Sequence, residues 1–106
     1  MIVEERLYTL KPECPVGALL EVYESTGALE LQKRVLGRLI GYFTTEVGTL
    51  NCVVHLWGYE SFEDRARRRA ALNVESVWKD YLEKVRPMLA SMENRLLLPT
   101  AFSPIR

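Results

Sequence analysis

The chain has 106 residues, of which 48% are apolar and 26% are charged, a composition typical of one globular domain. Basic and acidic residues both number 14, so the formal net charge is zero. This balance excludes a strong electrostatic binder of nucleic acid or anionic lipid. No segment approaches the ~20 apolar residues of a membrane span. We therefore expect neither nucleic-acid partners nor a membrane-spanning segment.

Two cysteines, Cys14 and Cys52, are too few for a disulfide framework and favour a reducing compartment. The first residues, MIVEERLYTL, are partly acidic and strand-like, unlike the basic and apolar run of a signal peptide. We expect a cytoplasmic protein that is complete as a single domain over residues 1–106.

The N-terminal third predicts a strand, a helix and a connector. Ile2–Leu10 alternates well enough to be a first strand. Pro15 fits a first helical position, and apolar residues follow at helical spacing over Val16–Tyr23. Thr26–Gly37 contains two glycines and is expected to form a connector.

A β-hairpin is predicted in the middle of the chain. Arg38–Glu46 and Asn51–Glu60 are rich in aromatic and β-branched residues, and Val47–Leu50 separates them. A loop symmetric about Gly48-Thr49 sets the register. The expected pairs are Tyr42 with His55, Ile40 with Trp57, Thr44 with Val53, and Glu46 with Asn51.

The two faces of this hairpin differ in character. We expect packed helices to cover the smaller, apolar face, made of Leu39, Gly41, Phe43, Thr45, Cys52, Val54, Leu56 and Gly58. The large aromatic face would then stay uncovered by helices. With residues of the first strand, it would carry Tyr8, Ile40, Tyr42, His55, Trp57 and Tyr59.

The C-terminal half predicts two helical segments and a strand. Ser61 begins a helix, because an acidic residue three positions later completes a near capping box. Asn73 is expected to cap a second helix, and Val74–Val85 carries a wide apolar stripe that we interpret as packing. Pro87 breaks this helix, and Met92–Leu98 is expected to be the last strand.

The predicted order is β-α-β-β-α-β, the ferredoxin-like α+β arrangement with helices on one side of an antiparallel sheet. A monomer rarely exposes a large aromatic sheet face. We therefore expect a homodimer in which two open sheet faces meet as an α/β barrel, with Ile40, Trp57 and Tyr59 near the interface. Association beyond the dimer is left open.

Four segments are distinctive: LYTLKP, QKRVLGRLIGYFTTEVGTLNCVVHLWGYESFEDRARRRAAL, VWKDYLEKVRP and SMENRLLLPT. They span nearly the whole chain and resemble the NIPSNAP family, in particular its short, single-module bacterial members. The resemblance implies the dimeric α/β-barrel form of the ferredoxin-like fold and no settled biochemical function. Related dimeric barrels include cofactor-free monooxygenases, a likeness of fold that does not fix function.

Six side chains form a candidate ligand pocket inside the expected barrel: Arg6, Tyr8, Tyr42, His55, Trp57 and Arg95. His55 is the only histidine, and it could move protons or orient a ligand carbonyl. The alternative is a structural histidine bonded to Tyr42 or to a carboxylate. We favour the structural interpretation because no nucleophile or second base accompanies His55.

Arginines suggest two further alternatives. Arg6 and Arg95 lie in neighbouring predicted strands and could clamp a carboxylate, although ion pairs with Glu4, Glu5 or Glu93 are the favoured interpretation. The run Arg65–Arg69 is interpreted as a solvated helix face paired with Glu63 and Asp64. A docking site for an acidic partner is its alternative.

Nothing in the sequence has the spacing of metal ligands or of a glycine-rich phosphate loop, so we expect no metal and no cofactor. The preferred hypothesis is a non-catalytic module that binds a small ligand or another protein. The alternative is a cofactor-free monooxygenase- or isomerase-like enzyme acting on a small aromatic or carboxylated substrate, with His55 as general acid or base.

Overall fold

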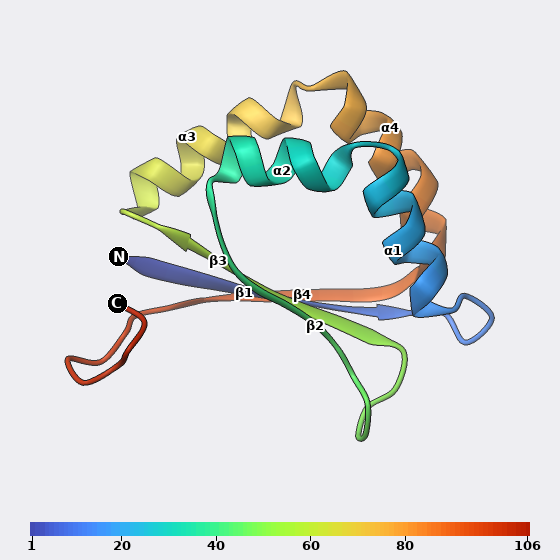
Figure 1. The fold of residues 1–106 in the computed structure, drawn as a ribbon, viewed down its shortest axis with the longest axis horizontal. Coiled ribbons are helices and arrows are strands. Elements are labelled where there is room, and N and C mark those ends of the chain that lie inside the picture. Colours follow the sequence, from blue (N-terminus) through green and yellow to red (C-terminus); the bar gives the residue numbers. More distant parts are fainter.

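A computed structural model describes residues 1–106 as a four-stranded antiparallel sheet with helices across one face (Figure 1). The strands, in spatial order β2-β3-β1-β4, are β1 (Ile2–Leu10), β2 (Arg38–Thr44), β3 (Cys52–Tyr59) and β4 (Leu89–Leu97). The helices are α1 (Val16–Ser25), α2 (Ala28–Leu36), α3 (Phe62–Asn73), α4 (Ser76–Val85) and the 3-10 turn η1 (Arg86–Met88). The element order and sheet topology confirm the predicted ferredoxin-like α+β fold. No helix combines the length and apolar character needed to cross a membrane.

The predicted connector over residues 26–37 was wrong, because most of it forms α2. Gly27 adopts φ = 84°, a left-handed conformation that costs glycine little, and it lets α2 begin directly after α1. The buried face of α2 consists of Ala28, Leu31, Gln32 and Leu36, at helical spacing.

The prediction that Asn73 caps a helix was also wrong, since Asn73 is the last residue of α3 and α4 starts at Ser76.

The start of α3 confirms the capping prediction. The Ser61 hydroxyl accepts a hydrogen bond of 3.0 Å from the Asp64 backbone N–H, and the Asp64 carboxylate accepts one of 3.0 Å from Glu60 N–H. Asp64 also pairs with Arg67 and Arg68 at 2.6 Å and 2.9 Å. These pairs stabilise the first turns of α3, where a negative charge also complements the helix dipole.

The hairpin register agrees with prediction in part. Tyr42 lies opposite His55, and Thr44 lies opposite Val53, as expected. Trp57, however, lies opposite Leu39 rather than Ile40, because the register shifts between Leu39 and Gly41. Such a bulge places an extra residue in one strand and changes the face on which the residues beyond it lie.

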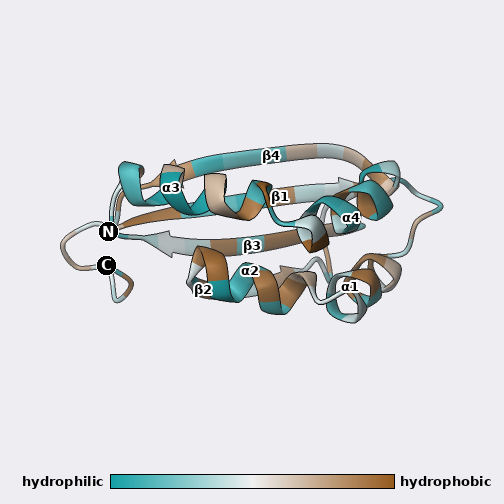
Figure 2. Cartoon of the chain, turned by 90° about the horizontal axis from the view of Figure 1, so that it is seen from above, coloured by the Kyte–Doolittle hydropathy of each residue, from teal (hydrophilic) through white to brown (hydrophobic).

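The assignment of the two sheet faces was wrong. His55, Trp57 and Tyr59 are buried beneath the helices of their own chain, whereas Phe43 on the opposite face is 55% exposed. The helices are arranged over this one face, with α3 largely hydrophilic and α2 banded by hydrophobic residues (Figure 2). Their inner sides contribute Tyr23, Trp78 and Tyr81, which pack with the sheet aromatics into one core. Burying the larger aromatic face removes more apolar surface from water, which explains why the helices cover it.

Candidate functional site: a pocket between the sheet and the helices

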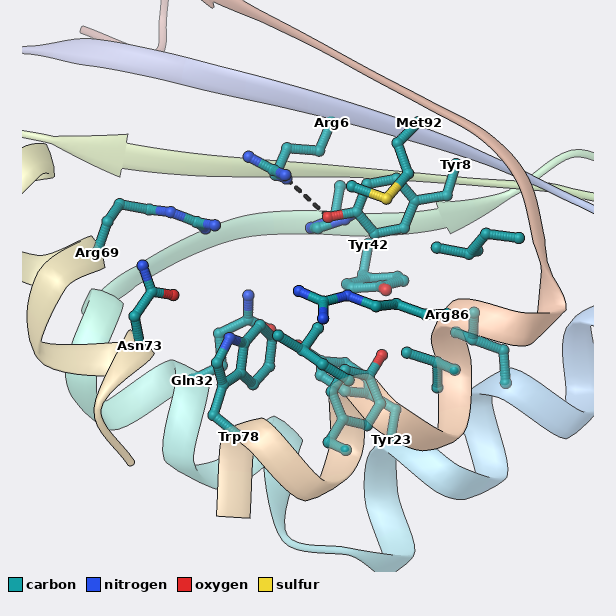
Figure 3. A pocket seen from close by; sticks show the side chains of 16 residues that line it. Arg6, Tyr8, Tyr23, Gln32, Tyr42, Arg69, Asn73, Trp78, Arg86 and Met92 are labelled. Carbon is teal, nitrogen blue, oxygen red and sulfur yellow. Dashed lines mark hydrogen bonds between the residues drawn. The ribbon is translucent and has the colours of Figure 1, made fainter. Parts of the chain in front are cut away.

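A small cavity lies between the aromatic face of the sheet and the helices that cover it (Figure 3). Its volume is about 130 Å³. The 16 lining residues come from all four strands, all four helices and η1: Arg6, Tyr8, Leu19, Tyr23, Gln32, Tyr42, His55, Arg69, Asn73, Trp78, Tyr81, Leu82, Val85, Arg86, Leu89 and Met92. For comparison, a cavity of about 150 Å³ can bind benzene. The space therefore suits a single ring or a short chain rather than a drug-sized molecule.

His55 stands at the sheet side of this pocket with its ring fixed on several sides. The imidazole stacks on Tyr42, with ring centroids 4.5 Å apart and planes 12° from parallel, and it meets the Tyr8 ring edge-on at 5.0 Å. Its Nδ1 accepts a 2.8 Å hydrogen bond from Trp57 Nε1, while its Nε2 is buried and has no partner. Burial, together with the positive charge of Arg6, lowers the pKa of His55 to about 3.

Arg6 is held by two residues of its own strand. Its Nε donates to the Tyr8 hydroxyl at 2.7 Å, and its Nη1 donates to Glu4 Oε2 at 2.9 Å. Glu4 is fully buried and also accepts hydrogen bonds from Arg65 and Asn94. Burial opposes ionisation of Glu4, but these hydrogen bonds and the charge of Arg6 outweigh it and lower its pKa to about 2.

Two more arginines reach the pocket without an acidic partner. Arg69 of α3 and Arg86 of η1 form no ion pair, and no aspartate or glutamate lines the cavity. Figure 3 shows the side chains of Arg6, Arg69 and Arg86 pointing toward the middle of the pocket from three different elements. The lining thus carries an excess of positive charge that the protein itself does not neutralise there.

Three tyrosines of the pocket keep their hydroxyl groups protonated. Burial raises the pKa of Tyr23, Tyr42 and Tyr81 above the ordinary value of a phenol. The Tyr23 hydroxyl donates to Gln32 Oε1 inside the core. These rings therefore provide flat apolar walls with hydrogen-bond donors at their ends.

The structure brings four of the six predicted site residues together, namely Arg6, Tyr8, Tyr42 and His55. Trp57 does not line the pocket, but it donates a hydrogen bond to His55, which does. Arg95 does not belong to the site: it lies on the opposite face, 69% exposed, and donates to Glu5 at 2.7 Å. The reason is the alternation of side chains along β1 and β4, which puts Glu5 and Arg95 on one face and Arg6 on the other.

The location of the pocket also differs from the prediction. It lies under the helices of one chain, not between two sheets, because the aromatic face is the covered one. The ion pairs expected as the alternative to an arginine clamp do form, between Arg6 and Glu4 and between Arg95 and Glu5. Arg6 still lines the pocket although it pairs with Glu4.

Sequence reasoning did not identify the residues that the helices contribute, such as Arg69 and Arg86. A signal for Arg69 was available in its spacing: Arg65, Arg69 and Leu72 lie on one side of α3, and Arg65 and Leu72 both face inward. Arg86 had no comparable signal, since its position depends on how α4 turns into η1 before β4.

These features define a ferredoxin-like α+β protein with an arginine-rich pocket beneath its helices. A family model described as NIPSNAP matches residues 3–104, and the chain belongs to the NIPSNAP family.

Curated relatives are longer proteins. The chain is 40% identical to a NipSnap homolog of Dictyostelium discoideum, over 71% of this chain and 33% of that protein. It is 29% identical to NipSnap homolog 2 of Homo sapiens, over 99% of this chain and 35% of that protein. The chain thus spans about a third of the length of the curated relatives that it matches.

Solved structures of bacterial family members are similar in length. A NIPSNAP family protein of Agrobacterium tumefaciens is 42% identical, with a TM-score of 0.93 over 99% of this chain and 98% of that one. A NIPSNAP-like domain protein of Burkholderia xenovorans is 51% identical, with a TM-score of 0.88 over 97% and 88% of the two chains. A candidate antibiotic biosynthesis monooxygenase of Nitrosomonas europaea has a TM-score of 0.67 over 96% of this chain and 100% of that one, at 12% identity, and so shares the fold alone.

Proposed function

We propose that the protein binds a small anionic molecule in the pocket beneath its helices. The observation that carries this proposal is the charge of the lining, which has three arginines and no carboxylate. Glu4 neutralises Arg6, but Arg69 and Arg86 have no acidic partner. An anion between them would complete charge-assisted hydrogen bonds, which are stronger than neutral ones.

The size and walls of the cavity narrow the class of ligand. At about 130 Å³ it is close to the volume that accommodates benzene. The rings of Tyr42, Trp78 and Tyr81 border it and provide aromatic surfaces for stacking. A single aromatic ring that carries one carboxylate matches both the walls and the charge.

A binding role fits this geometry better than acid-base catalysis. His55 is the only candidate base in the lining, and its lowered pKa and occupied Nδ1 leave it a poor acceptor of protons. No carboxylate stands in the pocket to take its place. The likeness to a candidate monooxygenase concerns the fold, which hosts many functions.

Calorimetric titration with benzoate tests the proposal, with benzyl alcohol as a neutral ligand of similar shape. We expect benzoate to bind the wild type more tightly than benzyl alcohol does. Arg86→Gln should weaken benzoate binding by about tenfold, the loss expected for one charge-assisted hydrogen bond. The control is Arg67→Gln, which removes an equal charge from an arginine outside the pocket. Equal binding of both ligands, or equal losses in both variants, would contradict the proposal.

We further propose that the uncovered sheet face pairs with the same face of a second copy, giving a homodimer of the α/β-barrel type. Leu7 and Phe43 lie opposite Val54 on this side, and Leu56 follows Val54 on the same face of β3, where no helix covers them. Two such faces are self-complementary, as an isologous interface requires. One solved neighbour is described as a dimeric ferredoxin-like protein, at 14% identity and a TM-score of 0.70.

Light scattering at micromolar concentration measures the assembly. The wild type should have the mass of a dimer, and Val54→Glu should give a monomer because it places a charge in the middle of the interface. The control Val74→Glu adds the same charge at an exposed position on the helix side and should stay dimeric. A monomeric wild type would refute the dimer.

A reducing, cytoplasmic location stays our expectation, in keeping with the free thiols of Cys14 and Cys52.

A further inference from the structure

We propose that His55 serves this pocket as a neutral hydrogen-bond donor, whose Nε2–H binds an oxygen of the anion, and that Trp57 enforces this role. The inference rests on the proposed function, since it names the group that recognises the ligand oxygen. It differs from the earlier hypothesis of a general acid or base, because here His55 neither gains nor loses a proton.

The hydrogen bond from Trp57 determines which nitrogen of His55 carries the proton. An indole N–H can only donate, and Trp57 Nε1 lies 2.8 Å from His55 Nδ1. The Nδ1 atom must therefore accept, which leaves it without a hydrogen. A neutral imidazole has one N–H, so the proton resides on Nε2.

The Nε2–H group lacks an acceptor within the protein. His55 is only 2% exposed, and its Nε2 is buried without a hydrogen-bond partner. Most buried polar groups in proteins are paired, so an unpaired donor in a pocket lining points to a missing partner. The rings of Tyr42 and Tyr8 lie against the imidazole, and neither hydroxyl oxygen accepts a hydrogen bond from Nε2.

A second donor stands beside His55. The Tyr8 oxygen accepts its hydrogen bond from Arg6 Nε at 2.7 Å, so the hydroxyl proton of Tyr8 is free to donate elsewhere. Tyr8 and His55 both line the cavity, with their rings 5.0 Å apart. Two neutral donors, with the charge of Arg6 behind one of them, suit an oxygen that bears negative charge, such as a carboxylate or phenolate oxygen.

The surroundings keep the imidazole neutral. The charged and titratable groups that face it are Glu4, Arg6 and Tyr8 from β1, Tyr42 from β2 and Arg69 from α3. Burial and the two arginines oppose a positive charge on His55, and Glu4 only partly compensates. Protonation would also have to occur at Nδ1, where the Trp57 N–H already points.

The single histidine makes a direct test practicable by NMR of protein labelled with ¹⁵N-histidine. We expect one protonated nitrogen, Nε2, and one unprotonated nitrogen, Nδ1, with no change between about pH 5 and pH 8. Addition of benzoate should shift the Nε2–H proton downfield as it gains an acceptor. A proton on Nδ1, or an imidazolium at neutral pH, would overturn the inference.

Two substitutions of His55 distinguish the effect of its hydrogen-bond donor from the effect of its packing. His55→Gln keeps an amide N–H near the position of Nε2, and we expect it to retain benzoate affinity within a few-fold. His55→Leu keeps the volume but removes the donor, and affinity should fall by about tenfold. If His55→Leu binds benzoate as the wild type does while Arg86→Gln weakens binding, this inference fails and the proposed function stands. If the wild type binds no benzoate, the proposed function fails and this inference with it.

Discussion

The Glu4 carboxylate of β1 accepts two hydrogen bonds from the Arg65 guanidinium of α3, at 3.1 Å and 2.8 Å. Asn94 of β4 and Arg6 of β1 donate to the same carboxylate at 2.8 Å and 2.9 Å. One fully buried acidic group thus connects the centre of the sheet with a helix that covers the pocket. Because Arg6 is both a partner of Glu4 and part of the pocket lining, this network also positions the site.

Removing the charge of Glu4 should destabilise the fold strongly. Glu4→Gln leaves Arg6 and Arg65 without their counter-charge in a buried setting, a change that costs about 3 kcal/mol or more. Glu5→Gln is the matched control, because Glu5 pairs with the exposed Arg95. This substitution should lower the unfolding free energy by less than about 1 kcal/mol. Urea unfolding at neutral pH measures both. Equal losses would show that the buried network contributes no more than the surface pair.

The same carboxylate should make stability depend on pH in the acid range. Its pKa is about 2 in the folded protein and 4.5 ordinarily, so its ionised form stabilises the fold above 4.5, and this contribution is lost as the pH falls toward 2. The difference in unfolding free energy between wild type and Glu4→Gln should therefore shrink over that interval. If this difference stayed constant down to about pH 2, the pKa of Glu4 would not be lowered in the folded protein.

The hydrogen bond from Trp57 to His55 should contribute to stability beyond the packing of the indole. Trp57→Phe removes the donor and leaves the buried His55 Nδ1 unpaired, at an added cost of about 1–3 kcal/mol. Trp78→Phe is the control, since Trp78 is buried in the same core and donates no hydrogen bond to the protein. Chemical denaturation should show the larger loss for Trp57→Phe. A loss no greater than that of the control would mean that the bond is not formed in solution.

A comparable pair of variants tests the bond between Tyr23 and Gln32. Tyr23→Phe leaves the buried amide oxygen of Gln32 without its donor, which should cost about 1–2 kcal/mol. Tyr81→Phe removes the same hydroxyl from a neighbouring ring that makes no hydrogen bond, so its effect should be small. Thermal unfolding followed by circular dichroism compares them. A smaller loss for Tyr23→Phe than for Tyr81→Phe would refute the assignment.

Local chemistry in the sequence was sufficient for the order of the four strands and for several close contacts. The turn after Thr44 set the pairing of Tyr42 with His55, because hairpin register depends on the residues next to the loop. Ser61 and Asp64 identified the start of α3, because a capping box involves only four consecutive residues. The helix α2 was missed although its apolar residues recur at helical spacing, since glycines at both ends suggested a connector.

Only the tertiary structure decided which face of the sheet the helices cover. Alternation along a strand defines two faces, but which of them the helices cover depends on how the side chains of distant helices pack against it. Tyr23, Trp78 and Tyr81 from the helices pack on the aromatic face. That packing encloses His55 and Arg6 in a pocket and leaves Arg95 outside it, on the open face.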